Sequence, residues 1–238
     1  MKTYGLIGRN ISYSFSRNYF NNKFKNEKIS NSQYINLDID NLSELNNIFN
    51  INNFGFNVTI PYKESIIPYL DSLDFHAKKI GAVNTIKIEK GNKIGFNTDW
   101  IGFKKSLQPL LKPHHTKALI LGTGGASKAV IYALEQMQIE TLIVSRNGKT
   151  SYQDLSEEII QNHTIIINCT PVGTFPNIDS SPNIPYNFIT DNHLAYDLIY
   201  NPAETLFLKK CKEKGAVIKN GLEMLEIQAE ESWKIWNS

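Results

Sequence analysis

Residues 118–146 combine an apolar strand pattern, a glycine-rich turn, a helical pattern and a second apolar strand. This order is typical of the first βαβ unit of a dinucleotide-binding domain, whose parallel sheet is connected by helical crossovers. Gly122 permits the tight turn, and Gly124 lets the backbone approach a pyrophosphate at the helix N-terminus. Ser127 takes the third glycine place of the usual fingerprint. The alternative interpretation is a tight turn that binds no ligand.

The second strand of this unit ends in Ser145, Arg146 and Asn147 rather than in an acidic residue. An NAD site usually carries Asp or Glu about 20 residues after the glycine turn, where it accepts hydrogen bonds from the ribose. A guanidinium at this place suits a 2′-phosphate, because it is always charged and binds bidentately. The sequence therefore predicts NADP as the cofactor.

Composition excludes several other classes of protein. A chain of 238 residues suits one or two domains, and a net charge of +2 gives no strong case for binding nucleic acid or an acidic membrane. No apolar run approaches the roughly 20 residues of a membrane span, and the N-terminus is too polar for a signal peptide. Cys169 and Cys211 lack metal-ligand spacing. Two unpaired thiols indicate a reducing compartment, so we expect a cytoplasmic protein without a bound metal.

Apolar strand patterns alternate with helical patterns along the whole chain, which predicts an α/β fold with a mainly parallel sheet. Before residue 100, the predicted strands span 3–8, 32–39 and 54–60, a hairpin spans 82–98, and helices span 16–27, 42–50 and 62–70. After it, we expect strands at 163–170, 193–200 and 216–220, helices at 99–111, 203–214 and 222–236, and a long loop at 171–185. In the last helix, Leu222, Leu225, Ala229 and Trp233 are expected to face inward.

Two further groups of residues could support chemistry. Lys63 and Asp99 each follow a predicted strand end, where ligands bind in open parallel sheets. If the strands are neighbours, the lysine could transfer a proton while the carboxylate orients it; the alternative is two solvated side chains. Ser14 and Ser16 lie where a helix begins, so they could hold an anion, or Ser16 could cap that helix. His114 and His115 are interpreted as surface residues.

Eight segments in order resemble the shikimate dehydrogenase family. They are SFS at 14–16, NVTIPYK at 57–63, GAVNT at 81–85, NTD at 97–99, GTGGASKA at 122–129, NCTPVG at 168–173, DLIYNPAETLFL at 197–208 and NGLEMLEIQA at 220–229. The resemblance implies two α/β domains: a substrate-binding domain of residues 1–99 plus 222–238, and a Rossmann-type NADP-binding domain of residues 100–221. The C-terminal helix is then expected to pack back on the first domain.

The resemblance also implies the reaction and the residues that perform it. The reaction is reversible reduction of 3-dehydroshikimate to shikimate by NADPH, a step of aromatic amino-acid biosynthesis. Lys63 is implied as the acid/base, paired with Asp99. Substrate contacts are implied for Ser14, Ser16, Thr59, Asn84, Asp99, Tyr200 and Gln228. Cofactor contacts are implied for Gly122, Thr123, Gly124, Gly125, Ala126, Ser127, Ser145, Arg146, Asn147, Leu198 and Gly221. The family contains monomers and dimers, so a homodimer is one expected state.

The chain departs from the family pattern at several places. Arg17 replaces a proline, Tyr13 a histidine, Trp100 a glycine and Thr174 a methionine. Ser145-Arg146-Asn147 replaces the usual NRT, which puts the strength of NADP preference in question. Two alternatives therefore stay open: an NAD-linked quinate or shikimate dehydrogenase, and a non-catalytic sensor that binds NADP or shikimate.

Overall fold

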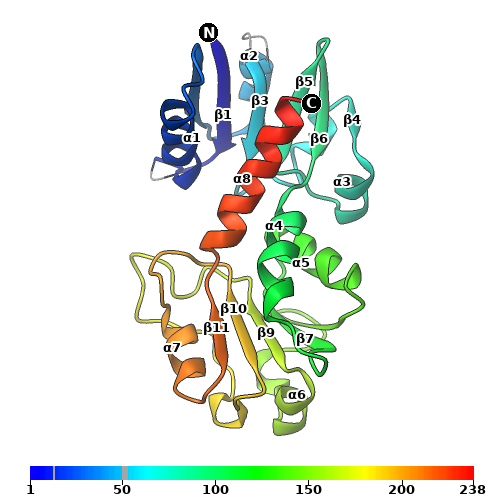
Figure 1. Cartoon of the computed structure of the whole chain (residues 1–238). Helices are drawn as coiled ribbons and strands as arrows, with labels where there is room; N and C mark the ends of the chain where they lie inside the picture. Colours follow the sequence, from blue (N-terminus) through cyan, green and yellow to red (C-terminus); the bar gives the residue numbers. More distant parts are fainter. Residues whose placement is uncertain (13, 50–52) are drawn as a thin grey trace. The chain divides into compact units, whose positions relative to one another are not determined.

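The computed structural model describes residues 1–12, 14–49 and 53–238, so Tyr13 and the end of the predicted helix at 42–50 lie outside the described residues. The chain divides into two compact units: unit 1 comprises Met1–Thr98 with Ala229–Ser238, and unit 2 comprises Asp99–Gln228. Each unit is an α/β structure built around its own sheet (Figure 1). The predicted fold class is therefore confirmed.

Unit 1 contains a six-stranded mixed sheet in the order β2-β1-β3-β5-β6-β4. Its elements are β1 (Lys2–Gly8), α1 (Phe15–Asn26), β2 (Ser32–Asp38), η1 (Leu42–Glu44), α2 (Leu45–Phe49), β3 (Asn53–Val58), η2 (Ile67–Tyr69), β4 (Ser72–Leu73), α3 (Phe75–Ile80), β5 (Thr85–Glu89) and β6 (Asn92–Phe96). Strands β2, β1 and β3 are parallel, and β5 runs antiparallel to β3 and to β6. The predicted hairpin is the β5–β6 pair.

The register of these strands brings four chain segments to one edge of the sheet. Asn57 pairs with Thr85, and Thr85 pairs with Phe96. Because β5 is antiparallel to both neighbours, the residues before β5 and after β6 lie beside the carboxyl end of β3. The carboxyl end of β1 lies at the same edge, since β1 and β3 are parallel.

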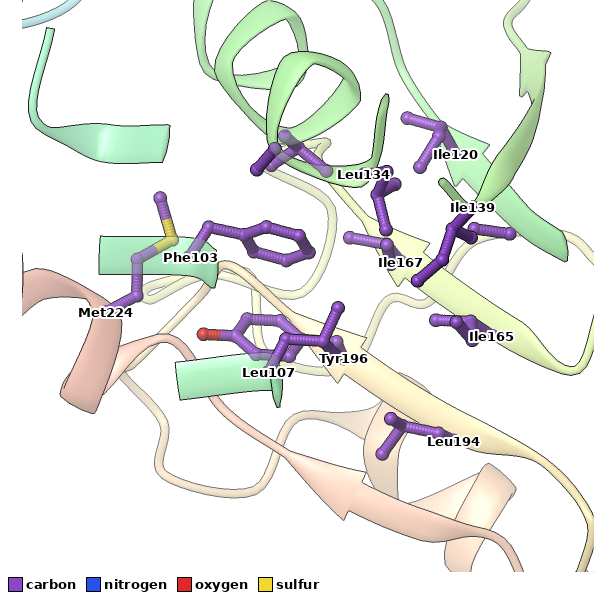
Figure 2. Close-up of a cluster of buried hydrophobic side chains, with 13 residues drawn as sticks. Phe103, Leu107, Ile120, Leu134, Ile139, Ile165, Ile167, Leu194, Tyr196 and Met224 are labelled. Atoms are coloured by element: carbon purple, nitrogen blue, oxygen red, sulfur yellow. The ribbon is translucent and has the colours of Figure 1, made fainter. Parts of the chain in front are cut away.

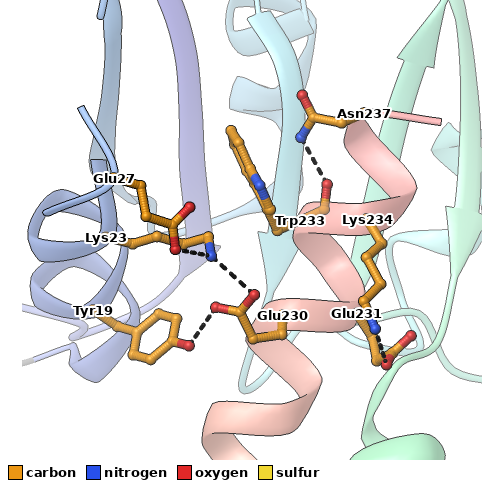
Figure 3. Close-up of polar contacts among 8 residues, drawn as sticks. All are labelled: Tyr19, Lys23, Glu27, Glu230, Glu231, Trp233, Lys234 and Asn237. Atoms are coloured by element: carbon orange, nitrogen blue, oxygen red, sulfur yellow. Dashed lines mark hydrogen bonds and ion pairs between the residues drawn. The ribbon is translucent and has the colours of Figure 1, made fainter. Parts of the chain in front are cut away.

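Unit 1 also includes the second half of the last helix, α8 (Leu222–Trp236). Trp233 and Trp236 join the aromatic cluster around Tyr4, and the Trp236 indole donates to the Ile86 carbonyl at 3.0 Å. Both tryptophans therefore serve packing, and these contacts confirm that the C-terminal helix packs on the first sheet. Figure 3 shows a polar contact beside them, in which Glu230 accepts hydrogen bonds from Tyr19 and Lys23 of α1.

The buried face of α8 differs from the predicted one. Leu222, expected to face inward, is 38% exposed. Ala229 is buried as predicted, and the other buried residues form a row of four at every fourth position: Met224, Gln228, Ser232 and Trp236. Apolar periodicity missed this face because two of its four residues are polar.

Unit 2 contains a five-stranded parallel sheet in the order β11-β10-β9-β7-β8. Its elements before α8 are α4 (Asp99–Leu107), η3 (Gln108–Leu110), β7 (Lys117–Leu121), α5 (Gly125–Glu135), β8 (Glu140–Val144), η4 (Tyr152–Asp154), α6 (Glu157–Asn162), β9 (Ile165–Asn168), η5 (Tyr186–Phe188), β10 (Leu194–Asp197), α7 (Leu206–Lys212) and β11 (Val217–Lys219). The strand order reverses between β7 and β9. Ligands of doubly wound sheets bind at such a point, beyond the carboxyl ends of the strands.

Both faces of this second sheet are buried. Ala118 and Ile120 of β7 pack into a cluster with Phe103 and Tyr196 (Figure 2), while Leu119 packs into a second cluster. Alternate residues of a strand point to opposite faces, which explains why the central strands are continuous apolar runs. No helix among the described residues is long and apolar enough to cross a membrane.

Two local predictions are wrong. The helix expected at 62–70 is only the 3-10 turn η2, since Pro68 lacks an N–H and disfavours the α conformation of the residue before it. His115 is buried rather than superficial: its Nδ1 accepts the Lys112 N–H at 3.0 Å, and its Nε2 lies 3.2 Å from the Asn192 carbonyl. This histidine holds the loop that enters β7.

Candidate functional site

The glycine turn stands at the point where the strand order of unit 2 reverses. Gly122 follows β7 with φ of 105°, a conformation that side chains rarely adopt. A β-carbon there would lie 2.9 Å from the Thr170 methyl group, in the loop after β9. The Gly122 N–H donates to the Val144 carbonyl at 2.8 Å. The turn therefore requires glycine and ties together the loops at the reversal.

Gly124 meets a different environment. It is the N-cap of the eleven-residue helix α5, and a β-carbon added to it would meet no atom of the described residues within 4 Å. Ser127 is buried, and its hydroxyl donates back to the Gly124 carbonyl at 2.6 Å. Helix N-terminal N–H groups have no intrahelical acceptor and attract anions. This open space fits the predicted approach of a pyrophosphate.

The residues after β8 form a tight exposed loop. The Ser145 N–H donates to the Thr150 carbonyl at 3.1 Å, which closes the loop around Gly148. Arg146 and Lys149 are both exposed on it. Lys149 is a second cation that our sequence interpretation missed, although its place three residues after Arg146 could have revealed it.

Leu198 and Gly221, both predicted to line the cofactor site, contact each other. A β-carbon on Gly221 would lie under 3.0 Å from the Leu198 carbonyl oxygen, and the Gly221 N–H donates to the Ile199 carbonyl at 3.1 Å. Packing alone therefore requires glycine at this position.

A fully buried carboxyl group supports the loops next to this site. Asp197, at the end of β10, accepts hydrogen bonds from Asn168 at 3.0 Å, from the Ile199 N–H at 3.1 Å and from Thr205 at 2.6 Å. Burial raises the pKa of Asp197 to about 6, while these three hydrogen bonds act in the opposite direction. Our sequence interpretation did not single out this residue.

We expect the stability of wild type, measured relative to Asp197→Asn, to fall as the pH rises from about 4 to about 6. The folded-state pKa lies above the ordinary value of 3.8, so the folded protein retains the proton in this window. The stabilising contribution is thus present below about pH 4, and up to about 3 kcal/mol is lost by pH 6. Urea unfolding at several pH values tests this. Parallel pH profiles for the two proteins would contradict it.

In unit 1, the two serines of the first motif have different environments. Helix α1 begins at Phe15 with Ser14 as its N-cap, so the prediction that Ser16 caps it is wrong. Ser14 is buried, makes no capping bond, and its Oγ lacks a hydrogen-bond partner among the described residues. Ser16 instead lies beside the buried Tyr34 phenol, where it opposes the rise in the pKa of that phenol that burial causes. An orphaned hydroxyl at a helix N-terminus is suited to bind a carboxylate.

Thr59, Lys63 and Asn84 lie at the same sheet edge. The Thr59 N–H donates to the Ile7 carbonyl at 2.9 Å, and the Lys63 carbonyl accepts the Val83 N–H at 2.7 Å. The buried Asn84 side chain accepts the Thr98 N–H at 2.7 Å. These bonds hold the three chain segments in a fixed relation.

In unit 2, a close helix–helix contact brings together the helices that carry Asp99 and Gln228. Asp99 is buried in the first turn of α4, where the helix dipole favours a negative charge. A β-carbon on Gly102 would lie 2.5 Å from the Met224 carbonyl and 3.2 Å from the Gln228 β-carbon. Glycine therefore permits this approach.

Trp100 and Tyr200 complete the candidate residues of unit 2. Trp100 packs edge-on against Tyr132 of α5, with ring centroids 5.5 Å apart, and also packs against the buried cluster that contains Phe103 and Tyr196. It thus connects α4 to the helix of the glycine turn. Tyr200 follows β10.

Lys63 belongs to unit 1 and Asp99 opens unit 2, and their pairing stays a prediction. Within residues 1–12, 14–49 and 53–238, no three His, Cys, Asp or Glu side chains gather as metal ligands would.

Comparison with known proteins identifies the family. A family model described as the shikimate dehydrogenase substrate binding domain matches residues 6–86. A relative from Clostridium botulinum named shikimate dehydrogenase (NADP(+)) is 40% identical over 99% of this chain and 96% of its own length. The chain belongs to the shikimate dehydrogenase family.

Solved structures of shikimate dehydrogenases show the same fold. The Aquifex aeolicus enzyme matches with a TM-score of 0.89 and 38% identity, covering 100% of this chain and 92% of that one. The Thermus thermophilus enzyme, crystallised with NADP(H) and shikimate, matches with a TM-score of 0.88 and 28% identity, covering 99% of this chain and 93% of that one. The resemblance inferred from eight motifs is thereby confirmed.

Proposed function

We propose that this protein is a shikimate dehydrogenase that reduces 3-dehydroshikimate to shikimate with NADPH, and that it works in aromatic amino-acid biosynthesis. One observation carries the proposal: the open N-terminus of α5 lies where the strand order reverses, and the loop after the adjacent strand β8 presents Arg146 in place of an acid. Family membership over nearly the whole chain supports the same activity.

The cofactor would be held by residues of unit 2. The turn from Gly122 to Ser127 receives the pyrophosphate, because its backbone N–H groups and the absence of a side chain at Gly124 allow close approach. The loop at 145–147 receives the adenosine 2′-phosphate. Leu198 and Gly221 would line the nicotinamide end. Bound NADPH supplies the hydride.

The substrate would be held by residues that follow strand ends. Ser14 and Ser16 bind the carboxylate, which gives the orphaned Ser14 hydroxyl its partner. The ring hydroxyls are assigned to the remaining candidates of the motifs: Thr59, Asn84, Asp99, Tyr200 and Gln228. Several converging hydrogen bonds orient a small polyhydroxylated acid.

Lys63 is assigned the proton transfer, with Asp99 as its partner. Reducing a ketone creates an alkoxide oxygen, and the Lys63 ammonium delivers a proton to it while the hydride goes to the carbonyl carbon. In the reverse direction Lys63 takes the hydroxyl proton. Asp99 is assigned the role of orienting the ammonium.

Four assays test the proposal: NADP or NAD, each with shikimate or quinate, followed by absorbance of the reduced nicotinamide. We expect NADP with shikimate to give the highest kcat/KM. A clear preference for quinate with NAD would favour the quinate enzyme instead. Binding of both ligands without turnover would indicate a sensor.

We expect Arg146→Ala to raise the KM for NADP by roughly 10–100-fold, since hydrogen bonds to a charged group contribute that much. The KM for NAD should change little, because NAD lacks the 2′-phosphate. Lys209→Ala, which removes an exposed cation of α7, is the control. Equal effects on both cofactors would remove Arg146 from phosphate recognition.

We further propose a cytoplasmic location and small molecules as the only partners apart from a second copy of the chain. The two free cysteines support a reducing compartment. Light scattering distinguishes a homodimer from a monomer.

A further inference from the structure

The buried face of α8 carries a hydroxyl where an apolar side chain would be expected. Ser232 is 0% exposed and lies between Gln228 and Trp236 on that face. A buried hydroxyl weakens a core unless it finds hydrogen-bond partners. Its contacts therefore indicate why this position is polar.

Ser232 connects three different segments of unit 1. Its Oγ accepts a hydrogen bond from the Asn57 amide at 2.9 Å and lies 2.8 Å from the Thr85 hydroxyl and 3.2 Å from the Thr98 hydroxyl. Asn57 is on β3, Thr85 begins β5, and Thr98 follows β6. One hydroxyl of the C-terminal helix thus reaches all three segments at the sheet edge that carries the candidate substrate residues.

Two of these partners also hold the side chain of Asn84. Its Oδ1 accepts the Thr98 N–H at 2.7 Å and the Thr85 hydroxyl at 3.0 Å, and its Nδ2 donates to the Thr98 hydroxyl at 2.9 Å. The orientation of the Asn84 amide therefore depends on the two threonine hydroxyls. Those hydroxyls are in turn oriented by Ser232.

The same network reaches the candidate carboxylate site. The Asn57 Oδ1 accepts a hydrogen bond from the Tyr34 phenol at 2.8 Å, and the Ser16 hydroxyl lies beside that phenol. All of these groups are buried. A continuous buried network thus joins Tyr34, beside Ser16, to Asn84 through Asn57, and Ser232 lies at its centre.

We infer that Ser232 is a positioning residue for substrate binding, which orients Asn84 through Thr85 and Thr98. Alanine at position 232 would fill the core equally well. A hydroxyl that hydrogen-bonds three side chains additionally restricts the rotamers of all three. The inference rests on the proposed function, in which Asn84 contacts a ring hydroxyl. It gives the C-terminal helix a role in substrate recognition besides that of Gln228.

The test is a comparison of steady-state kinetics for the full-length wild type, Ser232→Ala and the control Ser106→Ala. Ser106 is equally buried, and its hydroxyl lies 2.7 Å from that of Tyr196, outside the candidate site. We expect Ser232→Ala to raise the KM for shikimate by roughly tenfold, the effect of about one hydrogen bond. The KM for NADP should stay unchanged. Both variants should lose similar thermal stability, and the control should keep the wild-type KM for shikimate.

An unchanged KM for shikimate in Ser232→Ala would overturn the inference, as would equal rises for both substrates. If that variant does not fold, Ser232→Cys preserves the volume with weaker hydrogen bonds. A severalfold rise in its KM for shikimate would then support the inference, and a wild-type value would overturn it. Absence of shikimate turnover by wild type would contradict the proposed function and the inference together. Normal wild-type turnover with unaffected variants contradicts the inference alone.

Discussion

Lys63→Ala is expected to lower kcat roughly 10²–10⁴-fold, the usual contribution of a proton-transfer group. Without Lys63, the shikimate hydroxyl has no nearby proton acceptor in the oxidation direction, and the alkoxide formed from the ketone has no nearby donor in the reduction direction. The KM for shikimate should change little, because the ring and the carboxylate are assigned to other side chains. Initial rates at saturating NADP and shikimate give the comparison.

Lys78→Ala is the matched control, since this lysine is exposed on α3 of the same unit. It should retain the wild-type rate. If Lys63→Ala kept a rate close to that of wild type, another residue would have to supply the proton. Unfolding curves for each variant separate a chemical defect from a folding defect.

Gly221→Ala should destabilise unit 2 by about 3 kcal/mol, the upper range for overpacking a buried site. Its new methyl group would press on the Leu198 carbonyl, and backbone atoms cannot turn aside as a flexible side chain can. Urea denaturation without cofactor measures the loss. A variant as stable as wild type would mean that the contact relaxes at little cost.

Gly124→Ala is the informative contrast, because the same substitution there enters open space at a negative φ of −71°. Its stability without cofactor should stay within roughly 0.5 kcal/mol of wild type. Its dissociation constant for NADP should rise roughly tenfold or more, as expected when about one charge-assisted hydrogen bond is lost. Calorimetric titration with NADP measures the dissociation constant, and urea denaturation compares the stabilities of the two variants. Unchanged NADP affinity in Gly124→Ala would contradict the pyrophosphate assignment.

Local patterns predicted the strands and helices that have strong periodicity and clear end signals. The β7–α5–β8 unit was found because apolar runs and a glycine turn are read within a few residues. The helix predicted at 62–70 was wrong because that prediction did not weigh the effect of Pro68 on the backbone. His115 and Leu222 were placed wrongly because their exposure depends on elements distant in sequence. Asp197 was missed because nothing in the local pattern marks a buried carboxyl: two of its donors, Ile199 and Thr205, follow in the next loop, and only Asn168 lies on another strand, β9.

The sequence by itself determined the α/β class, the glycine turn between strand and helix, the arginine in place of the acid and the family. Each of these depends on residue type and short spacing, which act locally. Only the tertiary structure showed that Gly124 faces open space while Gly221 is enclosed, and that the Ser14 hydroxyl has no hydrogen-bond partner among the described residues. It also revealed the network through Ser232, whose partners lie 134–175 residues away in the chain. Such contacts arise from strand register and helix docking, and no local pattern encodes them.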